Sequence, residues 1–163
     1  MDMKIKTVSF DLNLFVPRLS NENVVFIPVK QDKNSAGLIE VDFADVEFLS
    51  CRKQGEEPMV GEEQFARLKE TERILFGASV FMGLWKDFQV KREDSVLENL
   101  YRIKQIISID FFGDVISIPR GGEFVFWLRR FVSDNSWHWL YGWMRAECLD
   151  HRLSAVSGPK IRD

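Results

Sequence analysis

The sequence is poor in the residues that most often build covalent or metal-bound sites. Its 163 residues include only two cysteines, two histidines and two tyrosines. Two cysteines, Cys51 and Cys148, do not make a disulfide framework, so we expect them to be reduced. Cys148 and His151 have a spacing that suits two metal ligands, but a structural zinc site needs four ligands and no second pair follows. We therefore expect neither a metal nor a cofactor.

Long apolar runs and an excess of basic residues are missing too. The longest apolar stretch without a charge, Ile74–Trp85, has twelve residues, which is too short to span a bilayer. The first residues, Met1–Thr7, lack the apolar segment of a signal peptide. The net charge is −3, from 22 basic and 25 acidic residues, whereas nucleic-acid-binding proteins usually carry a basic excess. We expect a cytoplasmic protein that binds neither membranes nor nucleic acids.

Large aromatic residues are the most distinctive feature that is present. Aromatic residues make up 13% of the chain, with 14 Phe and 5 Trp. In the segment Ser136–Met144, rings occupy every second position, as Trp137, Trp139, Tyr141 and Trp143. Because a strand points alternate side chains to opposite faces, the pattern predicts four rings along one face of a sheet.

Two segments have the apolar periodicity of amphipathic helices. These are Glu62–Phe76 and Ser95–Ser108, and the second begins with the residue spacing of a capping box. Ala78–Val90 fits a helix or a strand, because periodicity does not distinguish the two in a short buried run. The glycines and the proline of Arg52–Gly61 predict a loop between the strands and the first helix.

Strands are predicted in both halves of the chain. In the N-terminal half they are Lys4–Asp11, Asn23–Val29, Leu38–Phe43 and Val46–Leu49, with a polar turn at Gln31–Ala36. In the C-terminal half, Val115–Pro119, Phe124–Val132 and Trp137–Glu147 form an antiparallel meander, joined by Gly121-Gly122 and by a turn over 133–136. Asp110 and Asp114 are placed in a turn that enters the meander. Residues 152–163 lose the pattern and are predicted to form a flexible tail.

These elements predict one α+β domain over residues 1–163. We expect a bent, mainly antiparallel sheet of about six to eight strands, with two principal helices packed on one face. In the predicted register, Ile116 lies opposite Trp127, and Trp127 lies opposite Gly142, which leaves room for the indole. One face is then mainly aliphatic around Trp127 and is the expected partner of the helices.

The other face is unusual because it is aromatic and carries arginines. Its rings and arginines are the candidate ligand-binding residues: Phe124, Phe126, Arg130, Trp137, Trp139, Tyr141, Trp143 and Arg145. Three interpretations are open, namely that the rings are core, that they form a homo-oligomer interface, or that they line a ligand cavity. No residue is assigned a catalytic role, and His138 is expected on the opposite face near Arg129 and Phe131.

Three classes of function follow from this face. The leading hypothesis is a non-catalytic binding protein for a small apolar, aromatic or cationic ligand. The second is a protein-interaction or inhibitor-type module that acts as a homo-oligomer and offers the acidic surface around Glu40–Glu72 to a basic partner. The third is a small enzyme that uses the same cavity, with Tyr141, Arg130 or a carboxylate as the acid or base.

Overall fold

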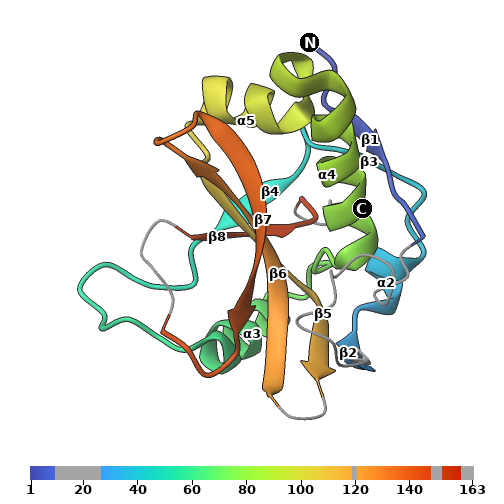
Figure 1. Cartoon of the computed structure of the whole chain (residues 1–163). Coiled ribbons are helices and arrows are strands. Elements are labelled where there is room, and N and C mark those ends of the chain that lie inside the picture. The colour runs from blue at the N-terminus through green and yellow to red at the C-terminus, as the bar shows by residue number, and fades with distance from the viewer. Residues whose placement is uncertain (10–26, 119–120, 148–151, 159–163) are drawn as a thin grey trace, which may run out of the picture.

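The chain has a mixed α+β fold, as its sequence predicts. The computed structural model describes residues 1–9, 27–118, 121–147 and 152–158. Over these residues there are eight strands and four α-helices, together with one short 3-10 helix. Antiparallel pairs dominate the sheets, and the helices lie around the larger sheet (Figure 1).

One long strand, β5 (Ser108–Ile118), organises the larger sheet. On one side β5 pairs with β6 (Gly122–Phe131), which pairs in turn with β7 (Ser136–Trp143). On its other side, the first part of β5 pairs with β8 (Leu153–Val156) and the second part with β2 (Ile27–Gln31). Only the β5–β8 pairing is parallel among the strands described.

Three short strands complete the described sheets. β4 (Glu47–Leu49) pairs with β8, on the side away from β5. β1 (Lys4–Lys6) and β3 (Glu40–Asp42) form a separate two-stranded sheet. β1, β3 and β4 fall within predicted N-terminal strands, whereas β2 overlaps the predicted Asn23–Val29 and continues to Gln31. Residues 10–26 lie outside the described part of the chain.

The helices confirm both predicted helical segments and add to them. The helices are α2 (Lys33–Ala36), α3 (Gly61–Glu70), α4 (Ala78–Lys91) and α5 (Val96–Lys104), with the 3-10 helix η1 (Arg92–Asp94) before α5. The Ser95 hydroxyl caps α5 by accepting a hydrogen bond from the Glu98 amide at 3.3 Å. Both α3 and α5 end earlier than predicted, and α2 occupies part of the predicted polar turn. The ambiguous segment 78–90 is helical in α4.

The aromatic face of the sheet is covered by α4 and α5, which corrects the expectation that both principal helices lie on the aliphatic face. Phe81, Leu84 and Phe88 follow one another at helical spacing on α4, and all three are buried. Phe81 stacks on Phe126 of β6 with ring centroids 4.8 Å apart and planes 6° from parallel. Aromatic rings bury large areas, so this contact anchors α4 on the sheet.

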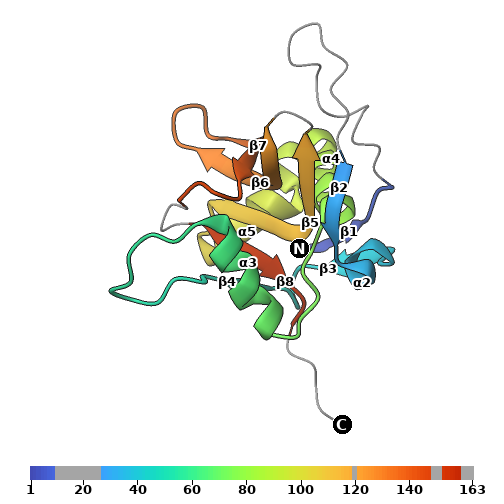
Figure 2. The same cartoon turned by 90° about the horizontal axis from the view of Figure 1, so that it is seen from below.

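The opposite face is covered by α3. Leu68 of α3 packs there with Val125 and Met144 of the meander and Val156 of β8. The three longer helices therefore do not share one face: α4 and α5 lie on one side of the sheet, and α3 lies apart from them (Figures 1 and 2). A sheet buried on both sides needs no polar face, which agrees with the meander sequence.

The predicted register of the meander is wrong in both halves, but the predicted faces hold between β6 and β7. Between β6 and β7 the pairing is shifted by two residues from the prediction, so the same side chains share a face, with Phe124 opposite Trp143. Between β5 and β6 the predicted pairing of Ile116 with Trp127 is wrong. Ile116 pairs with Phe124, because Gly122, predicted in the turn, lies in β6 opposite Ile118. Farther from the hairpin, an irregularity in β5 between Phe111 and Ile116 shifts the pairing once more.

The predicted C-terminal tail is wrong for the segment that forms β8. This strand lies between β4 and β5 in the sheet, and its residues 154–156 are buried. Arg152, just before it, binds the Asp110 carboxylate of β5 at 2.6 Å, and their side chains are only 8% and 1% exposed. Burial raises the pKa of Asp110, while the positive charge of Arg152 opposes that rise.

The Arg152 side chain explains why position 142 is a glycine. The Arg152 guanidinium lies over the Trp127 ring at 4.2 Å, and a Cβ at Gly142 would come within 2.9 Å of its Nη2. Gly142 therefore makes room for this guanidinium, and the predicted packing of the Trp127 ring onto the glycine is wrong. Asp110, Trp127 and Gly142 together hold Arg152 from three neighbouring strands.

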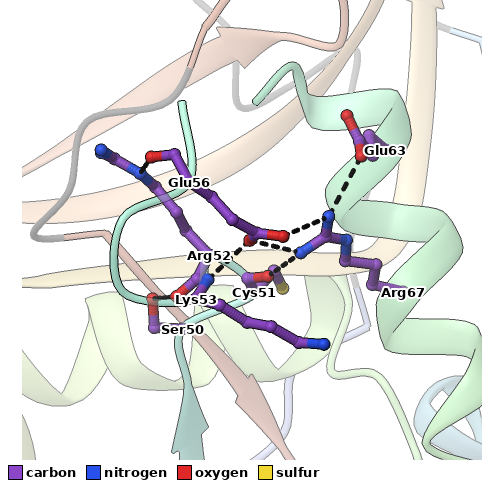
Figure 3. A network of polar contacts seen from close by, with 7 residues as sticks. All are labelled: Ser50, Cys51, Arg52, Lys53, Glu56, Glu63 and Arg67. Atoms are coloured by element: carbon purple, nitrogen blue, oxygen red, sulfur yellow. Dashed lines mark hydrogen bonds and ion pairs between the residues drawn. The ribbon is translucent and has the colours of Figure 1, made fainter. Parts of the chain in front are cut away.

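The loop before α3, residues 50–60, projects from the sheet (Figure 2). Hydrogen bonds from Arg67 of α3 anchor this loop to the helix (Figure 3). Its guanidinium donates to Glu56 at 2.8 and 3.1 Å, to the Cys51 carbonyl at 2.8 Å and to Glu63 at 3.2 Å. The hydrogen bond from Arg67, with a second from the Lys53 amide, lowers the pKa of Glu56 to about 2. One side chain thus fixes the start of α3 and the loop that leads into it.

Replacing Arg67 should return the Glu56 pKa toward its ordinary value. Because the folded pKa is depressed, the Glu56 contribution to stability is present above about pH 4.5 and is lost as the pH falls through about 2. In Arg67→Gln, an NMR titration of the Glu56 carboxyl carbon should show a pKa raised from about 2 toward 4.5, with the remaining Lys53 amide hydrogen bond still lowering it. An unchanged midpoint in this variant would contradict the contact.

Removing one partner of the buried ion pair should destabilise the protein strongly. Arg152→Met leaves the Asp110 carboxylate buried without its counter-charge, so the free energy of unfolding should fall by about 3–5 kcal/mol. Urea denaturation measures this loss. The matched change at an exposed arginine of α5, Arg102→Met, should leave stability within about 0.5 kcal/mol.

Candidate functional site

Three of the eight predicted site residues belong to the core. Phe124, Phe126 and Trp137 are at most 2% exposed and pack with α4 and α5. Their rings extend the contact between Phe81 and the sheet, so they stabilise the fold and do not line an open site. For these three residues, the interpretation of the aromatic face as core is the one that the structure supports.

Arg130, a fourth predicted residue, is engaged within the protein. Its Nε donates to the Glu98 carboxylate at 3.1 Å, and its guanidinium lies 4.0 Å from the centroid of the Tyr101 ring. Both partners come from α5, and the Arg130 and Glu98 side chains are almost buried. This arginine therefore docks α5 on the end of β6 and is not a free polar group in a cavity.

The remaining rings emerge from the core toward one end of the sheet. Trp139 is half-buried and touches the Phe126 ring, whereas Tyr141 and Trp143 are 37% and 36% exposed. Tyr141 and Trp143 meet edge to face, 5.6 Å apart, and both rings contact Phe124 beneath them. We call Tyr141 and Trp143 the aromatic rim.

A pocket of about 720 Å³ opens beside the aromatic rim. It is lined by residues of the β5–β6 hairpin, of α3 and of the end of β7: Glu62, Ser117, Gly121, Gly122, Glu123, Trp143, Met144 and Arg145. We call this the rim pocket. It includes two of the predicted residues, Trp143 and Arg145, and its volume lies within the range of about 300–1,000 Å³ that small-molecule sites occupy.

Backbone contacts hold the two sides of the rim pocket together. The Glu62 amide donates to the Met144 carbonyl at 3.0 Å, and the Met144 amide donates to the Glu123 carbonyl at 2.9 Å. Gly61, the first residue of α3, allows this approach, because a Cβ there would lie 3.1 Å from the Met144 backbone. The hairpin closes at Gly122, whose φ of 86° suits glycine.

The charges of the rim pocket are mainly acidic. Glu62 and Glu123 line it together with Arg145. Arg145 lies 3.8 Å from Glu62, but both side chains are exposed, so this ion pair is weak. The Glu62 carboxylate therefore stays accessible to a ligand. An indole face next to carboxylates attracts cations, since the ring quadrupole and the negative charge act in the same direction.

The histidine of the meander lies on the side that the sequence predicts. The His138 ring meets Phe131 edge to face at 5.1 Å, and its Nε2 lies 2.5 Å from an Asp134 carboxylate oxygen. This hydrogen bond lowers the pKa of Asp134. The pair fixes the turn between β6 and β7. Cys148 and His151, the other residues considered as metal ligands, lie outside the described residues.

The buried charges were not identified from the sequence. Asp110 and Asp114, predicted in a turn, lie within β5 and are buried. Asp114 accepts a hydrogen bond from the Ala78 amide at the start of α4, and burial raises its pKa. The available signal was the apolar–polar alternation of residues 107–111, in which Ser108 and Asp110 lie between Ile107, Ile109 and Phe111, because such alternation marks a strand.

Comparisons with known proteins add no functional information. No protein-family model, no curated protein and no solved structure matches the chain. Among the described residues, no three His, Cys, Asp or Glu side chains gather as a metal-ligand set. No helix in the described ranges is long and apolar enough to cross a membrane.

Two tryptophans of β7 should respond differently to truncation. Trp137→Ala opens a cavity under α4 and α5, so the free energy of unfolding should fall by about 3–5 kcal/mol. Trp143→Ala removes a ring that is already partly in solvent and should cost no more than about 2 kcal/mol. Chemical denaturation of both variants measures the difference, and equal losses would contradict the assignment of core and rim.

Proposed function

We propose that this protein is a non-catalytic binding protein that takes a small cationic or aromatic ligand in the rim pocket. The observation that carries this proposal is the exposure of Trp143 and Tyr141 on a strand whose neighbouring Trp137 is fully covered. Burying such rings is favourable, so a chain that leaves two of them in solvent beside a pocket has a surface suited to a ligand.

The charges of the rim pocket support a cation in particular. The Trp143 ring supplies a π face, and Glu62 and Glu123 supply negative charge from the two sides of the pocket. An ammonium or guanidinium group against the indole would gain both interactions. A flat aromatic ligand would gain ring contacts with the aromatic rim.

A second candidate uses the same rings as a homo-oligomer interface. Tyr, Trp and Arg are enriched where proteins meet, and Tyr141, Trp143 and Arg145 lie close together in sequence at the end of β7. Light scattering over a range of concentrations separates the two candidates. A dimer that Trp143→Arg dissociates would favour the interface, and a monomer at all concentrations would favour the ligand pocket.

The enzyme hypothesis has less support from the geometry. Arg130, one of the groups considered for acid–base chemistry, is held by Glu98 and Tyr101. Tyr141 is flanked by the rings of Phe124 and Trp143. The proposal therefore gives Tyr141 no acid–base role and treats its ring as support for Trp143.

Benzyltrimethylammonium is a suitable probe of the rim pocket, because it combines a ring with a quaternary cation. Titration calorimetry should show saturable binding to the full chain, with a shift of the Trp143 indole N–H resonance. Trp143→Ala should weaken binding by about 3- to 30-fold, which is the range expected for the loss of one cation–π contact.

Charge-matched variants test the role of the carboxylates. Glu62→Gln combined with Glu123→Gln should weaken binding of the probe, whereas Glu70→Gln combined with Glu72→Gln, which changes the net charge equally at the other end of α3, should not. Binding that survives Trp143→Ala unchanged would overturn the proposal.

A further inference from the structure

A second, smaller pocket gathers positive charge in a chain whose net charge is −3. This pocket has a volume of about 280 Å³, and four cationic side chains line it. They are Lys30 from β2, Lys33 from α2, Lys69 from α3 and Arg73 from the turn that follows α3. Because these side chains come from four different elements, the fold and not one local charge run brings them together. We call this the basic pocket.

Most of this positive charge is not held in an ion pair within the described part of the chain. Arg73 is paired with Glu47, but Lys30, Lys33 and Lys69 form no ion pair with any residue that the structure describes. The acidic residue in the lining is Asp32, so three lysines face one carboxylate.

That carboxylate is already occupied by backbone amides. One oxygen of Asp32 accepts from the amides of Asn34 and Ser35 at 3.0 and 3.3 Å. The other oxygen accepts from the Leu75 amide at 2.9 Å. Asp32 therefore serves as the cap of α2 and as a link to residue 75, and it forms no ion pair with the lysines of the described pocket lining. The ammonium groups are left for an external anion.

The pocket also has an apolar side. Lys30 and Lys69 each place their ammonium group over the Phe65 ring, at 5.1 and 5.2 Å from its centroid. Phe65 in turn stacks on the buried Phe112 at 6.3 Å, and Leu75 is buried next to them in the lining. The cation–π contacts hold two ammonium groups at the pocket wall before any ligand arrives, which lowers the entropic cost of binding.

We infer that the basic pocket binds a small organic anion. An anionic oxygen group, phosphate or carboxylate, contacts Lys30, Lys33 and Lys69, and a single ring or short apolar chain packs on Phe65 and Leu75. The volume lies just below the range of about 300–1,000 Å³ for drug-sized ligands, so the ligand has about one ring. This site differs from the rim pocket in its residues and in the sign of its charge, and it does not depend on the proposed function.

Phenyl phosphate, benzoate and inorganic phosphate, each titrated into the full chain, test this site and distinguish the two anionic groups. We expect phenyl phosphate or benzoate to bind more tightly than inorganic phosphate, and the tighter of the two identifies the preferred group. Binding should weaken as sodium chloride is raised, because the ammonium groups are partly in solvent. Shifts should appear at the amides of residues 30–33 and 65–75 in NMR spectra.

Two charge-matched triple variants decide whether anion binding depends on the basic pocket or on the overall charge of the protein. Lys30→Gln, Lys33→Gln and Lys69→Gln together should weaken binding of the tighter aryl anion by at least about 10-fold, as expected for lost charge-assisted hydrogen bonds. Lys4→Gln, Lys6→Gln and Lys86→Gln together change the net charge equally and should leave the affinity within about 2-fold. Phe65→Leu should remove the preference for the aryl anion over inorganic phosphate.

Equal affinities of the two triple variants would overturn the inference, and so would a wild-type protein that binds inorganic phosphate as tightly as the aryl anions. Thermal denaturation checks that each variant is folded. If the triple variant unfolds, Lys33→Glu supplies the same test, because it changes a single exposed side chain. Unchanged anion binding in Lys33→Glu would overturn the inference.

Discussion

The rest of the structure depends on the packing of α4 and α5 against one face of the meander. The stack of Phe81 on Phe126 places α4, and the ion pair between Glu98 and Arg130 places α5. These contacts bury one end of the aromatic face and leave the other uncovered. The aromatic rim, Tyr141 and Trp143, is the part of this face that the helices do not reach. The position of the candidate site therefore follows from how the core is covered.

On the opposite face, a buried charge holds together segments that are distant in sequence. Asp110 and Arg152 are 42 residues apart, and their ion pair joins β5 to the start of β8. Taking two charges out of water is costly, and removal of either partner would leave an unpaired buried charge. The pair thus favours one placement of the last described strand, in the middle of the sheet instead of at a free end.

Local patterns in the sequence predicted the elements better than the contacts between them. The alternation in Ser136–Met144 placed the four rings of β7 on one face, because the period of a strand is fixed by its backbone geometry. The same alternation does not say which helix covers that face, and the candidate residues were therefore split between core and rim. The β5 irregularity and the position of Arg152 next to Gly142 are long-range features, and no period in the sequence encodes them. The basic pocket also arises from four separate elements.

Both pockets include residues of α3, with Glu62 in the rim pocket and Lys69 in the basic pocket, so one helix contributes an acidic residue to one pocket and a basic residue to the other. The central claim is that the covering helices divide the rings of β7 into core and rim. The most direct test is the enhancement of NMR relaxation of the tryptophan indole N–H groups by a soluble paramagnetic agent. We predict strong relaxation for Trp143 and protection for Trp137. Protection of both indoles, or exposure of Trp137, would contradict the account.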